Sequence, residues 1–295
     1  MTNPRRIHVA QSGPLLAFLL SALGLKRAAA KKLLKFGAVQ VGGATTRRFD
    51  HELRPGDEVA INDLRTMAAE ARFKEAKVRI VYEDEALIAV DKPEGLLTVA
   101  TDREQLETLF VQLNDYLRSR REQVAGRLFV VHRLDKDTSG LVLFAKSEKI
   151  KDALQAQWGG IEKTYFAIVR GRPVSEQGTI DNYLVEDSKS LKVSRCEASR
   201  PDAQRAVTHY RLLESVGARS LLEVKLETGR KHQIRVQLTG IGCPVVGDKR
   251  YGRKGSNTRM ALHAAMLRLV HPASGEQLVI KSPMPRAMRK MMLPR

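Results

Sequence analysis

Short apolar segments of strand length follow one another along most of the chain from residue 78 onward, and this pattern constrains the fold most. The segments are separated by polar turn residues and cover residues 78–82, 86–90, 128–131, 140–146, 163–169, 206–213, 221–227, 260–269 and 277–280. Helical spacing of apolar residues returns at about 105–121 and 147–158. The regular alternation of strand and helix that is typical of a doubly wound parallel sheet does not occur. The pattern predicts an α+β fold with a mainly antiparallel mixed sheet flanked by helices.

The first 62 residues have a different texture and predict a small α/β-hairpin module. Leucines recur at helical spacing over 15–23, and a second, basic helix is expected over 26–36. A turn at Gly42-Gly43 and a turn feeding a strand over 53–61 indicate a short hairpin sheet. We therefore expect three parts, which are the module at 1–62, a polar linker of mixed charge at 63–77, and the main domain at 78–295.

The chain carries 51 Lys and Arg residues against 33 Asp and Glu residues, which is a net charge of +18. This excess favours a polyanionic partner, and nucleic acid is the first expectation because Lys and Arg neutralise phosphates. A solvated basic surface and an acidic membrane surface are the alternatives. No apolar run reaches about 18 residues, so we expect no membrane span and no membrane partner, and the N-terminus does not fit a signal peptide. Two cysteines fit a reducing compartment, so we expect a cytoplasmic protein.

Three polar clusters interrupt the apolar segments, at positions where loops usually carry function. They are DKPEG at 91–95, HRLDKDTSG at 132–140 and GRKHQIR at 229–235. Each has an ordinary structural interpretation when it is taken alone, with Asp135 as a turn acid and Arg235 as a surface arginine on a helix. The chain contains no GxxxxGK[ST] phosphate loop, no GxGxxG fingerprint and no HExxH pair. The motifs therefore predict neither a cofactor nor a metal.

Together the clusters form an ordered set. The stretch HRLDKDTSGLVLFAKS at 132–147 closely resembles the signature of the RluA family of pseudouridine synthases. Four further family elements occur in the family's order along the chain. They are KPEGLLT at 92–98, before the signature, and KTYFAIVRG at 163–171, TGRKHQIRVQL at 228–238 and ALHA…HP at 261–272 after it. The N-terminal part resembles the S-four RNA-binding module, most closely over 31–61, although the module's usual helix entry and turn differ here. The resemblance to the synthases covers roughly residues 78–285.

The resemblance implies the pseudouridine synthase fold and the isomerisation of uridine to pseudouridine in RNA. This reaction breaks a C–N glycosidic bond, turns the base and rejoins it to the sugar through carbon. No redox change occurs and no external group enters, so neither a cofactor nor a metal is demanded. RNA is the expected partner, with ribosomal RNA first and transfer RNA second, and a monomer is favoured. The target uridine has to be turned out of stacked RNA at a cost of a few kcal/mol.

A carboxylate can act as a nucleophile or as an electrostatic partner toward a sugar, and the resemblance assigns this role to Asp135. Arg235 matches the family arginine that pairs with the carboxylate, and Tyr165 matches the tyrosine that stacks on the target base. The resemblance also implies that Leu262 is an apolar residue beside the base, and that His132 and Arg133 hold the flipped nucleotide. In the N-terminal module it implies three RNA-binding lysines, which are Lys31, Lys32 and Lys35.

Several alternatives stay open. Asp137 is the rival carboxylate, although it occupies a variable position of the motif. A hydrogen-bonding role within the fold is as reasonable for His132 as a substrate contact, and Lys92 and Lys163 fit structural or RNA-backbone contacts better than catalysis. Charge and the N-terminal module alone would also suit an RNA-binding or ribosome-assembly factor with a vestigial synthase site. A DNA-binding regulator would rest on the N-terminal helices alone.

Overall fold

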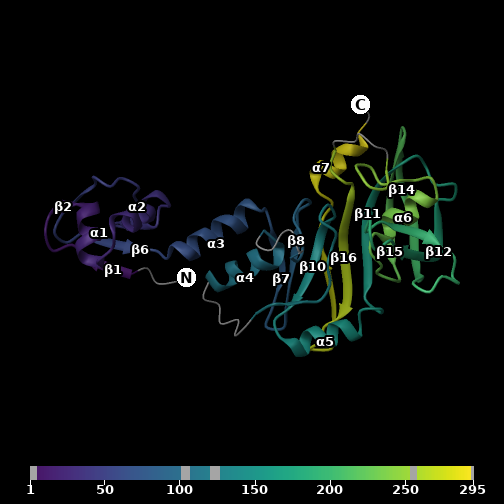
Figure 1. Cartoon of the computed structure of the whole chain (residues 1–295), viewed down its shortest axis with the longest axis horizontal. Helices are drawn as coiled ribbons and strands as arrows, with labels where there is room; N and C mark the ends of the chain where they lie inside the picture. Colours follow the sequence, from purple (N-terminus) through teal and green to yellow (C-terminus); the bar gives the residue numbers. More distant parts are fainter. Residues whose placement is uncertain (1–4, 101–106, 120–126, 253–257, 294–295) are drawn as a thin grey trace. The chain divides into compact units, whose positions relative to one another are not determined.

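The computed structural model describes residues 5–100, 107–119, 127–252 and 258–293. The chain divides into two compact units, which are Met1–Ala76 with Val111–Ala125 and Lys77–Phe110 with Gly126–Arg295 (Figure 1). None of the helices in the described ranges is long and apolar enough to cross a membrane.

The first unit begins with a small sheet packed on two helices, as the leucine spacing predicts. Its elements are β1 (Arg5–His8), β2 (Gly13–Pro14), α1 (Leu15–Leu23), α2 (Arg27–Lys35), β3 (Val39–Val41), β4 (Ala44–Thr45), β5 (Glu52–Leu53) and β6 (Glu58–Ile61). The larger sheet has the order β1-β6-β3-β4, and β2 pairs with β5. Leu15, Leu19 and Val59 are among the buried residues of its core. Both expected helices are confirmed, whereas β1 is an addition that the sequence did not indicate.

The basic helix α2 ends at Lys35 and is followed by a glycine in the left-handed region. Gly37 has a φ of +69°, and its N–H donates to the carbonyl of Leu34 while Ala38 N–H donates to that of Leu33. These two hydrogen bonds satisfy carbonyls that the helix end would otherwise leave unpaired. The motif fixes the exit of the chain from α2, whose lysines are exposed to solvent.

The stretch at 63–77 differs from the expected linker, because most of it is helix α3 (Leu64–Glu75). Its Ala, Glu, Arg and Lys residues are strong helix formers, and this propensity outweighs the polar, aperiodic appearance of the sequence. The ring of Phe73 stacks on that of Tyr116 in α4 (Leu109–Ser119), with ring centroids 4.1 Å apart. The outer ends of the helix expected at 105–121 lie outside the described residues.

The second unit is built on one large mixed sheet. Its strands are β7 (Arg79–Glu83), β8 (Leu87–Lys92), β9 (Phe129–Val130), β10 (Ser139–Ala145), β11 (Glu162–Arg170), β12 (Gln177–Glu186), β13 (Val193–Cys196), β14 (Gln204–Val216), β15 (Arg219–Leu226), β16 (Leu262–Val270) and β17 (Gln277–Lys281). The order is β13-β12-β14-β15-β11-β16-β10-β8-β7, with β17 on β16 and β9 on β10. The helical elements are α5 (Glu148–Ala156), α6 (Gln233–Gly240), α7 (Arg286–Arg289) and the 3₁₀ helix η1 (Lys290–Met292). The predicted α+β class with a mainly antiparallel mixed sheet is confirmed.

Strands β11, β16 and β10 run side by side in the middle of this sheet (Figure 1). β10 and β16 pair in parallel, with Gly140 opposite Ala264. Gly140 has a φ of +113°, and a Cβ there would collide with the backbone of Ala264. Glycine therefore follows Thr138 and Ser139 because the two backbones approach too closely for any side chain.

Candidate active site

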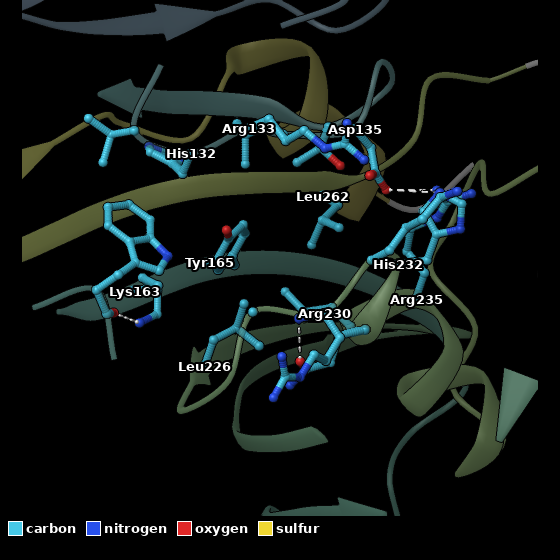
Figure 2. Close-up of a pocket in the computed structure, with 18 residues that line it drawn as sticks. His132, Arg133, Asp135, Lys163, Tyr165, Leu226, Arg230, His232, Arg235 and Leu262 are labelled. Atoms are coloured by element: carbon cyan, nitrogen blue, oxygen red, sulfur yellow. Dashed lines mark hydrogen bonds and ion pairs between the residues drawn. The ribbon is translucent and has the colours of Figure 1, made fainter. Parts of the chain in front are cut away.

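A cavity of about 410 Å³ opens where the centre of the large sheet meets three loops. Figure 2 shows side chains from β11, from the start of β16, and from the loops before β10 and before α6 pointing into it. Its lining includes every main-domain residue that the sequence assigned to the site, namely Asp135, Tyr165, Arg235, His132, Arg133 and Leu262. Asp137 is exposed and is not part of the lining. Lys31, Lys32 and Lys35 lie on α2 of the first unit instead.

The loop that carries Asp135 is fastened to the 92–98 segment. The Thr98 hydroxyl donates to the Leu134 carbonyl at 2.8 Å and accepts from the Leu134 N–H at 3.2 Å. Gly95 N–H donates to the Lys136 carbonyl at 2.9 Å. Two motifs that lie far apart in the sequence thus form one structure. Asp135 lies between Leu134 and Lys136, whose backbones are both hydrogen-bonded to the 92–98 segment.

Lys92 lies beneath the same loop and is fully buried. Its ammonium donates to the carbonyls of Pro93, Leu96 and Lys136 at 2.8–3.0 Å, so all three N–H bonds are used. Burial lowers the pKa of Lys92 to about 7, against the opposing effect of Asp135 and other nearby acids. The structural alternative for Lys92 is therefore correct, and a direct RNA-backbone contact is not.

Lys163 on β11 is also buried, and it serves the fold in the same way. Its ammonium donates to the carbonyls of Trp158 and Ile161 at 2.9 and 2.7 Å. These hydrogen bonds close the turn between α5 and β11 and keep Trp158 at the edge of the cavity. Trp158 and Lys163 both line the cavity.

Arg235 on α6 connects two carboxylates. Its Nη1 donates to Asp135 Oδ2 at 2.8 Å, while Nε and Nη2 donate to Asp248 Oδ2 and Oδ1 at 2.7 and 3.0 Å. Burial alone would lower the pKa of Arg235, but hydrogen bonds and charge from Asp248, with a smaller part from Asp135, raise it well above its usual range. The guanidinium is therefore permanently charged and is fixed in orientation by its bidentate partner.

Asp248 supports the site, although the sequence did not indicate it. Its side chain is 1% exposed, and its Oδ1 also accepts the N–H groups of Arg250 and Tyr251 at 2.9 and 3.0 Å. Burial would raise the pKa of Asp248, but Arg235 and these backbone donors lower it below its usual value. Its only sequence signal is a single acid in the stretch GDKRYG, which looks the same as an ordinary turn acid.

Arg235 addresses only one oxygen of Asp135. The hydrogen bond reaches Oδ2, and no donor among the described residues reaches Oδ1. The Asp135 side chain is 28% exposed, and Figure 2 shows it at the edge of the cavity facing Arg235 and His232. A carboxylate with one anchored and one open oxygen suits a nucleophile or an electrostatic partner of a developing positive charge.

Tyr165 and Leu262 form the wall of the cavity next to Asp135. Tyr165 lies on β11 opposite Val224 of β15, and Leu262 opens β16. Burial, and then the charge of Asp135, raise the pKa of Tyr165 well above its usual range. The phenol therefore stays protonated at neutral pH, so it presents an aromatic face and a hydroxyl donor rather than a phenolate.

His132 and Arg133 are neighbours in the sequence but have different contacts. His132 Nε2 accepts the backbone N–H of Leu143 at 2.9 Å, and its ring stacks on Trp158 with centroids 4.5 Å apart. Burial, with a smaller effect from Lys163, lowers the pKa of His132 to about 3, so the ring is neutral. Arg133 is exposed, and its guanidinium has no hydrogen-bond partner among the described residues. His132 thus has the structural contact that the sequence left open, and Arg133 is available to a phosphate.

The chain is similar to known proteins of one enzyme family. The RNA pseudouridylate synthase family matches residues 86–239. A ribosomal large subunit pseudouridine synthase D of Zymomonas mobilis is 34% identical over 289 residues, which is 93% of this chain and 90% of the relative. A tRNA pseudouridine synthase C of Vibrio parahaemolyticus is 34% identical over 228 residues, which is 70% of this chain and 90% of the relative.

Among solved structures, the human RNA Pseudouridylate Synthase Domain Containing 4 is similar, with a TM-score of 0.63 and 26% identity. The match covers 76% of this chain and 94% of the human one. The shared fold and the extent of the sequence matches lead to one conclusion: the chain belongs to the RNA pseudouridylate synthase family and is an enzyme that isomerises uridine in RNA.

Proposed function

We propose that this synthase modifies specific uridines in structured RNA, with ribosomal RNA as the first candidate and transfer RNA as the second, and that Asp135 is its catalytic carboxylate. The observation that carries the proposal is the Asp135–Arg235 pair in the cavity, 2.8 Å between charged atoms, with Asp135 Oδ1 left open. Relatives that are named for ribosomal and for transfer RNA are similar to this chain at the same level of identity. The identity values therefore do not rank the two RNAs, and ribosomal RNA is favoured by the greater share of this chain that its synthase matches.

The residues divide the work in a way that suits the chemistry. Asp135 provides negative charge through Oδ1 where the C–N glycosidic bond breaks and positive charge develops on the sugar. The ring of Tyr165 provides a face on which the uracil stacks while it is detached and turned. The Tyr165 hydroxyl keeps its proton, so it assists as a hydrogen-bond donor. Leu262 closes the wall beside the base and keeps water from the detached intermediate.

RNA is brought to the cavity by positive charge. Arg133 is free at the cavity and Arg230 lies exposed among its lining residues, where both suit the phosphates next to a turned-out nucleotide. Lys31, Lys32 and Lys35 are exposed on α2, which supports an S-four-like RNA-binding role for the module at 1–62. We propose that the enzyme works as a monomer in the cytoplasm, where stable RNAs carry enough structure to select the site.

The second candidate function is an RNA-binding or ribosome-assembly factor with a vestigial synthase site. The net charge of +18 favours this reading as much as it favours an enzyme. The complete set of Asp135, Tyr165 and Arg235 around one cavity speaks for a working site. The two functions separate in cells that lack the gene and carry either the wild-type or the Asp135→Asn protein.

The test is a map of pseudouridines in ribosomal and transfer RNA from such cells. We expect one or a few pseudouridines to vanish on deletion, to return with the wild type and to stay absent with Asp135→Asn. The RNA that loses them identifies the substrate. Full maps in the deleted cells, together with a growth or ribosome defect that Asp135→Asn repairs, would overturn the proposal in favour of the assembly factor.

A further inference from the structure

His232 lies beside the catalytic carboxylate in an unusual backbone conformation. It is the residue that precedes the first turn of α6, with φ of 54° and ψ of 15° in the left-handed region. Left-handed geometry at a residue other than glycine costs free energy and is kept where surrounding contacts enforce it. Here it turns the imidazole into the cavity, where Nε2 lies 3.6 Å from Asp135 Oδ2 (Figure 2).

The other ring nitrogen of His232 is held by Tyr251. Nδ1 lies 2.8 Å from the Tyr251 hydroxyl oxygen, and that oxygen accepts the backbone N–H of Val193 at 2.9 Å. With one lone pair engaged by Val193, the phenol has its own proton to donate, and Nδ1 is in line to accept it. A neutral imidazole that accepts at Nδ1 carries its proton on Nε2, which is the nitrogen that faces Asp135.

The groups around His232 keep the ring neutral. Burial lowers the pKa of His232; Asp135 opposes this, and the positive charges of Arg235, Lys231 and Arg250 add to the lowering. Lys231 is paired with Glu186, which weakens its share. Nδ1 accepts from Tyr251 and Nε2 carries the ring proton, so the ring has no free lone pair with which to remove a proton from the substrate.

We propose, resting on Asp135 as the catalytic carboxylate, that His232 is a positioning residue: Tyr251 fixes it as the Nε2–H tautomer, and it anchors Asp135 Oδ2 together with Arg235. Both side chains then face the same oxygen, at 2.8 Å from Arg235 and 3.6 Å from His232. The longer separation exceeds hydrogen-bond distance, and in this proposal it shortens when substrate binds, as catalytic contacts commonly do. Asp135 Oδ1 is thereby kept directed toward the substrate.

The test compares His232→Leu, His232→Gln and Tyr251→Phe in steady-state kinetics and RNA binding. We expect His232→Leu to lower kcat about 100-fold, since a small misplacement of a reacting group has that effect, with KM and RNA affinity unchanged. His232→Gln keeps an N–H near the Nε2 position and restores part of kcat. Tyr251→Phe keeps the ring but frees the tautomer, and it lowers kcat less than His232→Leu does. The control is His209→Leu on the exposed face of β14, which leaves kcat unchanged.

Nitrogen-15 NMR of histidine-labelled enzyme reads the tautomer directly and needs no variant of His232. We expect the His232 signals to report a proton on Nε2 in the wild type and a mixture of tautomers in Tyr251→Phe. A proton on Nδ1, or a kcat of His232→Leu equal to that of the wild type, overturns the inference while Asp135→Asn remains inactive. Activity in Asp135→Asn would instead show that the proposed function itself is wrong.

Discussion

At the scale of single residues, the site is a row of alternating charges from Asp248 through Arg235 to Asp135. The buried end of the row is fully satisfied, because Asp248 holds Arg235 with both oxygens and also accepts two backbone N–H groups. The open end is the carboxylate in the cavity. Burying a charge pair of this kind contributes little net stability, but it fixes geometry, and breaking it leaves an uncompensated charge.

This row leads to the first prediction. Asp248→Ala leaves the buried Arg235 with the half-exposed Asp135 alone, and we expect the free energy of unfolding to fall by about 3–5 kcal/mol and kcat to fall with it. Urea denaturation and kinetics below the transition measure both. Asp181→Ala is the matched control, because Asp181 also binds an arginine with both oxygens, but on the surface. Exposed pairs contribute little, so a similar loss in both variants would contradict the buried role of Asp248.

The second residue-scale prediction concerns pH. The pKa of His132 is about 3 in the folded chain against an ordinary value of 6.5. The unfolded chain therefore takes up a proton between these values that the folded chain does not, and stability is lost as the pH falls through that window. Urea denaturation at several pH values between 5 and 7.5 should show a steeper fall for the wild type than for His132→Gln. The exposed His209→Gln should keep the wild-type slope. Equal slopes in all three proteins would show that His132 is not a buried neutral ring.

Sequence could reveal only part of this arrangement. Asp135, Arg235 and Tyr165 stood in ordered motifs, so the resemblance found them. Asp248 lies in a loop whose composition resembles any turn, and nothing in the local sequence tells that it faces Arg235 across the chain. His232 stood inside a recognised cluster, but its role depends on the hydroxyl of Tyr251, which only folding brings to 2.8 Å.

At the scale of elements, the site depends on the parallel pairing of β10 with β16. This pairing brings the end of the Asp135 loop against the start of β16, where Leu262 forms the cavity wall. Gly140 makes the close approach possible. The loop is held from the other side by Thr98 and Lys92. Asp135 therefore stands on a short loop that is fastened at both ends.

This arrangement makes Gly140→Ala a test of the element. We expect a loss of about 3 kcal/mol or more in unfolding free energy, because left-handed strain of about 1–3 kcal/mol adds to a collision with the Ala264 backbone. The control is Gly217→Ala, which has a φ of +55° but open space around it and so shows the cost of strain alone, about 1 kcal/mol. Denaturant titration compares the two. An equally small loss in both variants would show that β10 and β16 are not so close.

Some strands and helices could not be predicted from the spacing of apolar residues. The strands of the apolar interior were predicted well, but the edge strand β13 and its neighbour β12 were missed because both carry exposed polar residues. For α6 the sequence indicated only that Arg235 could lie at the surface of a helix, because its polar residues 233, 235 and 237 alternate with apolar ones, as in a strand. They are buried nevertheless, since Gln233 and Gln237 bind the edge of β14 and Arg235 binds two carboxylates.

At the scale of the whole molecule, charge is distributed unevenly. The first 62 residues hold ten Lys and Arg residues and four acids, and three of the lysines stand exposed on α2. Composition predicted a polyanion partner correctly in kind, because the family acts on RNA. Composition could not predict the reaction, which resides in a few side chains around one cavity.

RNA binding can depend on the lysines of the N-terminal module or on the net charge of the whole chain. Replacing Lys31, Lys32 and Lys35 by Gln should raise KM for RNA, leave kcat unchanged and reduce the salt slope of RNA binding by about one per lysine. The control removes three exposed charges of the second unit, with Lys149→Gln, Lys281→Gln and Arg286→Gln. Equal effects of both triple variants would mean that RNA responds to net charge and not to the N-terminal module.

The assignment of the isomerisation to Asp135 can be checked by following the hydrogen at C5 of the target uridine. RNA labelled with tritium at C5 of uridine releases the label when C5 becomes the glycosidic carbon, so release counts turnovers. We expect release with the wild type and with Asp137→Asn, and none with Asp135→Asn, while all three bind the RNA with equal affinity. Release by Asp135→Asn at the wild-type rate, or its loss in Asp137→Asn instead, would show that Asp135 is not the catalytic carboxylate.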